Sequence, residues 1–111
     1  MNSYHIVITP DAEADLQILR SHMIHTLSAS DPTVKFLHTI KDAILSLQFM
    51  PERCAPVPQE PWHTRGVRRL IHRHFSIYYR IERASSQVYI LNVILNRRDQ
   101  LKALKDNSPT I

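Results

Sequence analysis

The sequence has little glycine and cysteine and no long apolar run, and each shortage excludes a class of protein. Gly66 is the only glycine among 111 residues, which excludes the glycine-rich loops that hold nucleotide phosphates. Cys54 is the only cysteine, so no disulfide can form within the chain, as is typical of a reducing cytosol. No apolar run approaches the roughly 20 residues of a membrane span, and the first residues lack the pattern of a signal peptide. We therefore expect a cytoplasmic protein that does not enter a membrane.

The length and composition are those of one ordinary globular domain. The chain is 43% hydrophobic and 22% charged over 111 residues, which lies within the usual range for soluble domains. We expect a single domain over residues 1–111, with residues 106–111 as a frayed tail.

Basic residues are concentrated in the second half of the chain. Residues 1–60 hold 4 Lys/Arg against 7 Asp/Glu, a net charge of −3, whereas residues 61–111 hold 10 against 3, a net charge of +7. One ten-residue stretch contains Arg65, Arg68, Arg69, His72, Arg73 and His74. Such a patch attracts polyanions or an acidic segment of a partner. The alternative is a solvated strand whose charges prevent edge-to-edge pairing.

The first half of the sequence predicts a strand followed by two helices. A β-rich run at residues 4–8 leads into Thr9-Pro10-Asp11, which supplies a helix cap, a first-turn proline and an acid. Apolar residues then recur at helical spacing to about residue 28, and again from Val34 to Leu47. The two helices are separated by a short break, so we expect an antiparallel helical hairpin.

The second half predicts three further strands. Residues 51–64 contain four prolines and are expected to form a loop, after which Gly66 suits a positive φ. The pattern of apolar residues then predicts strands at residues 67–74, 75–82 and 88–95. A short terminal helix is expected at residues 100–105.

The resulting order is β-α-α-β-β-β with a short C-terminal helix. We expect an α+β fold in which the helical hairpin covers one face of a twisted antiparallel sheet. The other face should be open and lined by Ser76, Tyr78 and Arg80. Function is expected on this open, basic face.

The basic and aromatic residues are candidates for two kinds of chemistry. Arginine forks match the geometry of phosphate and carboxylate groups, and the target-binding candidates are Arg65, Arg68, Arg69, Arg73, Arg80, Arg97 and Arg98. If the chain is a nuclease, its catalytic candidates are Arg69, His72, His74 and Tyr78, since imidazoles and phenols can transfer protons. His72 and His74 would share one face of a strand, but no third ligand lies nearby, so we expect no metal and no cofactor.

An ordered set of motifs resembles the RelE/ParE superfamily of bacterial toxins from type II toxin–antitoxin pairs. The motifs are Tyr4-x-Ile6-x-Ile8-Thr9-x2-Ala12-x2-Asp15-Leu16, Ile44-x2-Leu47-x2-Met50-Pro51-x-Arg53, Pro61-Trp62, Gly66-Val67-Arg68-x-Leu70, Phe75-x-Ile77-x-Tyr79-Arg80-Ile81 and Val88-x-Ile90-x2-Val93-x3-Arg97-Arg98-Asp99. The resemblance covers residues 4–101. It implies a helical hairpin on an antiparallel sheet and a growth-inhibiting toxin of the kind that takes part in plasmid stabilisation. It also implies an acidic cognate antitoxin that binds through a helix or an added strand.

Two mechanisms divide that superfamily, since RelE-like members cut mRNA on the ribosome and ParE-like members inhibit DNA gyrase. The RelE-like pattern has an arginine after the aromatic residue that opens the third strand, where this chain has Ser76 after Phe75. It also has a tyrosine or histidine near the C-terminus, whereas this chain has neither after Tyr89. Both departures favour a ParE-like toxin that binds gyrase. A ribosome-dependent mRNA endoribonuclease and a non-toxic RNA- or protein-binding module are the alternatives.

Overall fold

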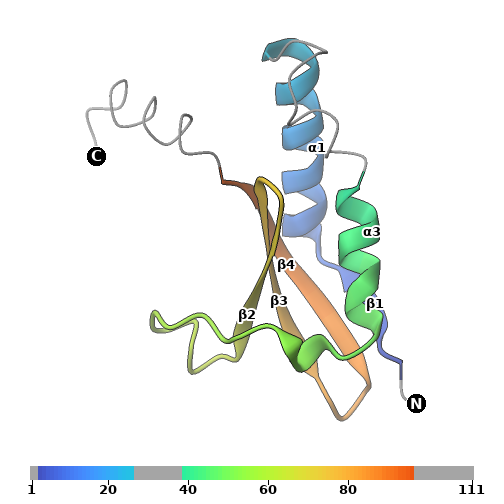
Figure 1. Ribbon diagram of the computed structural model, residues 1–111, viewed down its shortest axis with the longest axis vertical. Coiled ribbons are helices and arrows are strands. Elements are labelled where there is room, and N and C mark those ends of the chain that lie inside the picture. Colours follow the sequence, from blue (N-terminus) through green and yellow to red (C-terminus); the bar gives the residue numbers. More distant parts are fainter. Residues whose placement is uncertain (1–2, 27–38, 97–111) are drawn as a thin grey trace.

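The computed structural model describes residues 3–26 and 39–96 (Figure 1). Its elements are β1 (His5–Ile8), α1 (Pro10–Thr26), α3 (Ile40–Leu45), the 3-10 turns η1 (Ser46–Gln48) and η2 (Pro51–Arg53), β2 (Val67–His72), β3 (Phe75–Glu82) and β4 (Gln87–Leu95). The predicted α+β fold and its order of elements are confirmed. The first part of the predicted second helix, the predicted helix at 100–105 and the tail lie outside the described residues.

The four strands form one sheet in the order β1-β4-β3-β2. β2 pairs with β3, and β3 with β4, in antiparallel orientation, as the sequence predicts. β1 instead joins β4 in parallel, from His5 opposite Gln87 to Ile8 opposite Ile90. The sheet is therefore mixed rather than wholly antiparallel, because apolar alternation defines the faces of a strand but not its pairing partner.

Thr9 joins the end of β1 to the start of α1. Its hydroxyl accepts a hydrogen bond from the Ala12 N–H at 3.3 Å and donates one to the Ile90 carbonyl at 2.7 Å. Pro10 opens the helix, and Asp11 and Glu13 lie in its first turn, where acids are favoured by the helix dipole. The helix start predicted from Thr9-Pro10-Asp11 is thus confirmed, and the same side chain fixes the helix to the sheet.

The helices cover one face of the sheet and enclose the core. α1 and α3 run in opposite directions on the same side of the strands (Figure 1). Ala12 and Leu19 of α1 and Ile40, Ala43 and Ile44 of α3 are buried against Phe75, Ile77, Tyr79, Val88, Ile90 and Val93 of the sheet. Within residues 3–26 and 39–96, no helix has the length and apolar character needed to cross a membrane.

Tyr79 is the largest fully buried side chain, as its place on the predicted core face indicates. Its hydroxyl donates a hydrogen bond of 2.6 Å to the Pro51 carbonyl. Burial raises the pKa of this phenol above its ordinary value, so the hydroxyl remains a donor at all physiological pH. The contact ties the middle of β3 to the start of the proline-rich loop.

Arg53, in the motif Met50-Pro51-x-Arg53, has a structural role at the end of the α3–η1 segment. Its guanidinium donates to the Phe49 carbonyl at 3.0 Å and to the Ser46 hydroxyl at 2.8 Å. These bonds satisfy groups at the C-terminal end of the α3–η1 segment, where carbonyls lack helical partners.

Candidate interaction site on the open face of the sheet

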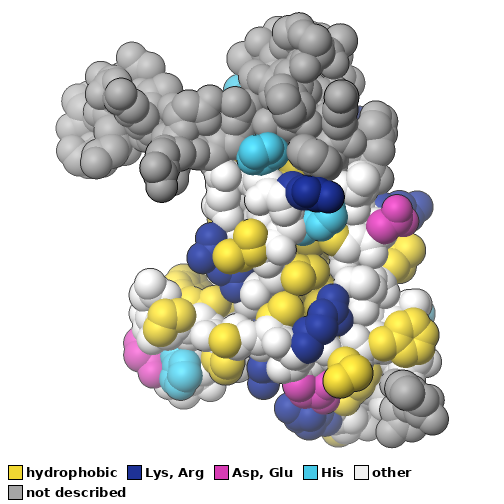
Figure 2. Space-filling model, in the orientation of Figure 1, with side chains coloured by type: hydrophobic (Ala, Val, Ile, Leu, Met, Phe, Trp, Pro, Cys, Tyr) yellow, Lys and Arg dark blue, Asp and Glu magenta, His cyan; other side chains and the backbone are white. Residues whose placement is uncertain are grey.

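The face of the sheet opposite the helices carries three rows of side chains. Directly paired residues on neighbouring strands point to the same face. The register defines the rows Val67–Arg80–Tyr89, Arg69–Tyr78–Asn92 and Ile71–Ser76–Ile94. We call the surface made by these three rows the open face. In the view of Figure 2, basic and apolar side chains are interspersed on the described surface, with few acidic ones between them.

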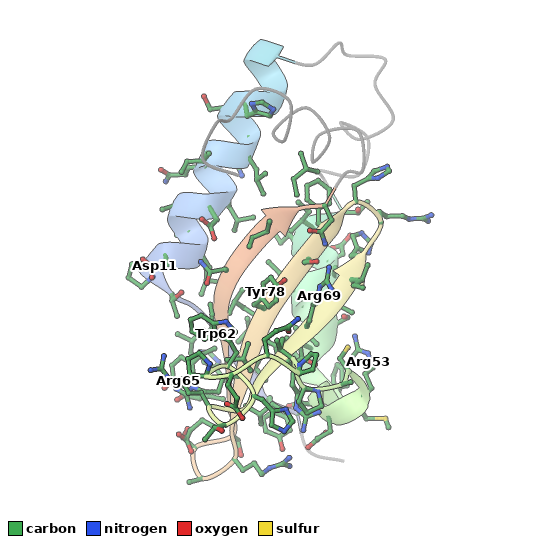
Figure 3. The ribbon with its side chains drawn as sticks, turned by 90° about the vertical axis from the view of Figure 1, so that its left-hand side faces the viewer. Asp11, Arg53, Trp62, Arg65, Arg69 and Tyr78 are labelled. Carbon is green, nitrogen blue, oxygen red and sulfur yellow. The ribbon has the colours of Figure 1, made fainter. Side chains whose placement is uncertain are left out.

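The loop of residues 55–66 passes in front of part of the open face (Figure 3). The Val57 N–H donates to the Val67 carbonyl at 2.8 Å, and the Val67 N–H donates to the Trp62 carbonyl at 3.0 Å. Gly66 has φ +77°, so the positive φ predicted for it is confirmed. These bonds fix the loop to the outer edge of β2.

Glu60 stiffens the tip of this loop. Its carboxylate accepts hydrogen bonds from the Thr64 hydroxyl at 2.8 Å and from the Thr64 N–H at 3.0 Å. Both bonds favour the charged form and lower the pKa of Glu60. The tip of the loop is therefore held in one conformation by hydrogen bonds within the loop.

A hollow of about 1040 Å³ lies between this loop and the sheet. The loop contributes Val57, Trp62 and Arg65, and the open face contributes Arg69, Tyr78, Arg80, Leu91 and Ile94 among others. No Asp or Glu is among the described residues that line it. The hollow is thus apolar in its walls and positive in charge.

Three arginines around the hollow each lie over an aromatic ring. Their Cζ atoms are 5.6 Å (Arg65 over Trp62), 5.9 Å (Arg69 over Tyr78) and 5.0 Å (Arg80 over Tyr89) from the ring centroids. Such contacts contribute about 0.5–1 kcal/mol each at exposed sites. They also restrict the arginine stems, so less side-chain entropy is lost when the guanidinium groups bind a ligand.

Ser76 fixes the orientation of Arg69 through a hydrogen bond. Its hydroxyl accepts hydrogen bonds from Arg69 Nε, at 2.8 Å, and from Asn96 Nδ2. The sequence predicts Ser76 as an open-face lining residue, but the structure buries it completely, because Arg69 and Asn96 lie over it. Since Nε is engaged, the two Nη groups of Arg69 are left to contact a ligand, and no acid in residues 3–26 or 39–96 forms an ion pair with them.

Arg68 and His72 face the helix layer and do not line the open face. Arg68 is paired opposite the buried Tyr79, and its guanidinium donates to the Cys54 carbonyl at 2.6 Å. His72 forms a 2.7 Å hydrogen bond with the Thr39 hydroxyl, and burial lowers the pKa of its imidazole. The structure therefore separates these two candidates from Arg69 and Tyr78.

The predicted strand over residues 67–74 is two residues too long. β2 ends at His72, and Arg73 turns the chain with φ +58°, so Arg73 and His74 form the turn between β2 and β3. His72 and His74 consequently do not share a strand face, and the described residues contain no group of three metal-ligating side chains. Arg97 and Arg98 lie outside the described residues.

The structure adds residues that the sequence reasoning did not place at the site. Trp62, which the sequence reasoning names only in the motif Pro61-Trp62, is 47% exposed and lines the hollow. Tyr89 is identified by its pairing opposite Arg80. Leu91 is an extra residue at a β-bulge opposite Tyr78 and Tyr79, and alternation alone cannot place a residue beyond such a bulge.

Comparisons with known proteins agree with this architecture. The family model described as ParE toxin of type II toxin-antitoxin system, parDE, matches residues 6–100. The chromosomal ParDE toxin–antitoxin system from P. aeruginosa is similar at 26% identity and TM-score 0.64, covering 86% of this chain and 98% of that chain. No curated protein matches the sequence.

Two further solved structures share the fold. The toxin–antitoxin complex RelBE2 from Mycobacterium tuberculosis has 23% identity and TM-score 0.62 over 86% of this chain and 94% of that chain. The isolated E. coli RelE toxin has 13% identity and TM-score 0.58 over 94% of this chain and 98% of that chain. At these identities the likeness concerns the fold alone, and it confirms the predicted RelE/ParE-type architecture.

Proposed function

Because this chain belongs to the ParE toxin family of type II toxin–antitoxin systems, we propose that it arrests growth by binding DNA gyrase through the open face of its sheet. The observation that carries this proposal is the composition of that face. It presents Arg69 and Arg80, each preorganised on an aromatic ring, beside apolar side chains. Arginine and aromatic residues are enriched in the parts of protein interfaces that contribute most binding energy.

The same face is poor in groups that move protons. Cleavage of RNA through its 2′-OH requires one group that accepts a proton and one that delivers a proton, both within hydrogen-bond reach. His72 lies on the helix side, bonded to Thr39, and the Tyr89 hydroxyl donates to Gln87 at 2.7 Å. Tyr78 is the phenol that lies beside Arg69. This shortage supports a toxin that acts by binding.

A ribosome-dependent mRNA endoribonuclease is the second candidate, and one observation favours it. Arg69 lies over the Tyr78 ring at 5.9 Å, which puts a cation and a phenol side by side. A cation can stabilise the charge that develops on a phosphate under attack, and a phenol can donate a proton. The alternative thus has a minimal pair of groups at the same place.

We also propose that a cognate antitoxin neutralises the chain. The similar P. aeruginosa structure is a ParDE toxin–antitoxin system, and the M. tuberculosis structure is a toxin–antitoxin complex. The net charge of +7 in residues 61–111 favours an acidic partner. Both the proposed partner and the proposed target place the action in the cytoplasm.

Pulse labelling of DNA and protein synthesis after tightly controlled induction in bacteria tests the gyrase proposal. DNA synthesis should fail first, and an Arg69→Ala variant should lose this effect while an Arg83→Ala variant keeps it. Arg83 is a matched control because it is exposed in the β3–β4 turn and paired with Glu52 at 2.9 Å. Failure of protein synthesis first, with mRNA cut on the ribosome, would establish the endoribonuclease instead. Normal growth would leave only the non-toxic binding module.

A further inference from the structure

The hollow beside the open face has an aromatic ring and an amide on its loop side and arginines on its sheet side. Trp62 and Gln59 line it from the loop, and Arg69 and Arg80 line it from β2 and β3 (Figure 3). Trp62 is the only tryptophan of the chain and is 47% exposed. An exposed ring and guanidinium forks in one hollow are the two features that recognise a base and its phosphates.

We propose that this hollow binds a nucleoside diphosphate or triphosphate. Its base stacks on Trp62, and its phosphates are held by Arg69 and Arg80. A chain with one glycine cannot form a glycine-rich phosphate loop, so the guanidinium groups alone hold the phosphates. Binding of the nucleotide does not depend on the proposed function, whereas its effect on target binding rests on that function.

Arg69 and Arg80 are placed to hold two neighbouring phosphates. Arg69 is paired with Tyr78 in the register, and Arg80 follows Tyr78 by two residues on the same face of the sheet. Such diagonal neighbours lie about 7–8 Å apart at the backbone, a separation that two long side chains close easily. Ser76 holds Nε of Arg69 at 2.8 Å, which leaves the two Nη groups for phosphate oxygens. A diphosphate can therefore contact both guanidinium groups at once.

The charges around the hollow favour an anionic ligand. Arg80 has one acidic neighbour, Glu82 at 3.5 Å, and both side chains are partly exposed, so this ion pair is weak and easily exchanged. No ion pair involves Arg69 within residues 3–26 and 39–96, and no Asp or Glu is among the described residues that line the hollow. The repulsion between the two arginines is therefore relieved when an anion binds between them.

The loop supplies the surface for the base. The guanidinium of Arg65 lies over the Trp62 ring at 5.6 Å from its centroid, and the residue still remains half-exposed. Aromatic rings stack on any base, and the amide of Gln59 both donates and accepts hydrogen bonds, as the edge of a base requires. The bonds of Glu60 to Thr64 fix the loop tip, so little ordering of the loop is needed when the ligand binds.

The size of the hollow also suits a nucleotide. Small-molecule sites usually enclose about 300–1,000 Å³, and this hollow measures about 1040 Å³. The loop bounds it at the edge of β2, where the Val57 N–H donates to the Val67 carbonyl at 2.8 Å. A free phosphate would satisfy the arginines but leave Trp62 and Gln59 without a contact, whereas a nucleotide engages both sides of the hollow.

A bound nucleotide would cover Arg69, the residue proposed to contact the target. Nucleotide and target would then compete for the same guanidinium group. The toxin would consequently be restrained where nucleotide is abundant and released where it is scarce.

Titration of ADP into the full chain, followed by Trp62 fluorescence and by calorimetry, tests the proposal. Adenine stacked on the only tryptophan should quench its emission. In calorimetry, Trp62→Leu should weaken binding by about 5- to 100-fold through the loss of stacking. Arg69→Gln and Arg80→Gln should each weaken it by about 10- to 100-fold, and Arg83→Gln in the exposed β3–β4 turn should bind as the unchanged chain does. Arg80 pairs only with the partly exposed Glu82 among the described acids, so its variant stays informative even where Arg69→Gln unfolds.

Pyrophosphate and a short single-stranded RNA are the comparison probes. ADP should bind about tenfold or more tightly than pyrophosphate, because only ADP reaches Trp62. Equal affinity for the two would overturn the proposal and identify a plain anion site. The absence of both quenching and heat at millimolar ADP would also overturn it, and RNA binding through Arg69 would then identify a nucleic-acid strand as the ligand.

Gyrase is absent from these titrations, so the two proposals fail separately. A chain that binds ADP but does not inhibit supercoiling contradicts the proposed target alone. A chain that inhibits supercoiling but does not bind ADP contradicts the nucleotide site alone.

Discussion

Ser76→Ala is the substitution that most directly tests how the open face is organised. The buried hydroxyl accepts from Arg69 Nε and from Asn96 Nδ2, and a hydrogen bond contributes about 0.5–1.5 kcal/mol net. Because Arg69 is exposed and can turn to water, we expect a loss of about 1–2 kcal/mol in unfolding free energy. For a domain of this size that corresponds to a fall in Tm of roughly 5–15 °C.

The same substitution should weaken target binding through Arg69. Without Ser76 the guanidinium loses its fixed orientation, and ordering such a side chain on binding costs about 0.5–1.5 kcal/mol, or roughly a 2- to 10-fold loss of affinity. Ser76 is thus a positioning residue. Arg69→Ala should cost a similar amount in unfolding free energy, about 1–2 kcal/mol, because it removes the donor to Ser76 and the contact with the Tyr78 ring, but it should cause a far larger loss of binding.

Thermal unfolding and affinity for purified gyrase, measured well below the Tm of every variant, provide the comparison. Ser85→Ala is the matched control, since its hydroxyl contacts Gln87 in the exposed β3–β4 turn and should alter neither quantity. A Ser76→Ala chain that is less stable but binds with unchanged affinity would refute the positioning role of Ser76.

Three further predictions concern the contacts that support the site. Tyr79→Phe should lower the unfolding free energy by about 1–3 kcal/mol in denaturant titration, because the Pro51 carbonyl would lose its buried donor; an unchanged midpoint would contradict this. Asp15→Ala should lower the unfolding free energy by a similar amount, about 1–3 kcal/mol, because its carboxylate accepts a hydrogen bond from the Val93 N–H at 3.0 Å. Asp11→Ala is the control, since Asp11 lies at the exposed helix start and its loss should lower the unfolding free energy by less than about 1 kcal/mol. The lowered pKa of His72 means that the folded state binds this proton less readily than the unfolded state, so stability should be full above about pH 6.5 and fall below it. His72→Gln should flatten that acid-side loss in Tm measured against pH, and an unchanged pH profile would exclude His72 as its source.

Local signals in the sequence were sufficient to predict the elements and much of the core. Thr9-Pro10 predicted the start of α1, the single glycine predicted a positive φ, and the alternation from Phe75 to Glu82 placed Tyr79 in the core. Each of these depends on the conformation of a few neighbouring residues, which the sequence specifies directly.

The site itself depends on contacts between distant segments. The sequence presents Ser76 as an exposed polar residue, but Arg69 of β2 and Asn96, which follows β4, make it buried. The helix-side position of His72 follows from the hairpin register, which depends on where the chain turns. A proline-rich loop gives no periodicity from which its position in front of β3 could be predicted.

We propose that this chain acts by binding gyrase through the open face rather than by cutting RNA. Supercoiling of relaxed plasmid by purified gyrase, with the unchanged chain and with Arg69→Ala added in turn, separates the two activities. The unchanged chain should inhibit supercoiling, and folded Arg69→Ala should not. Undiminished supercoiling in the presence of an unchanged chain that still arrests growth would contradict this proposal.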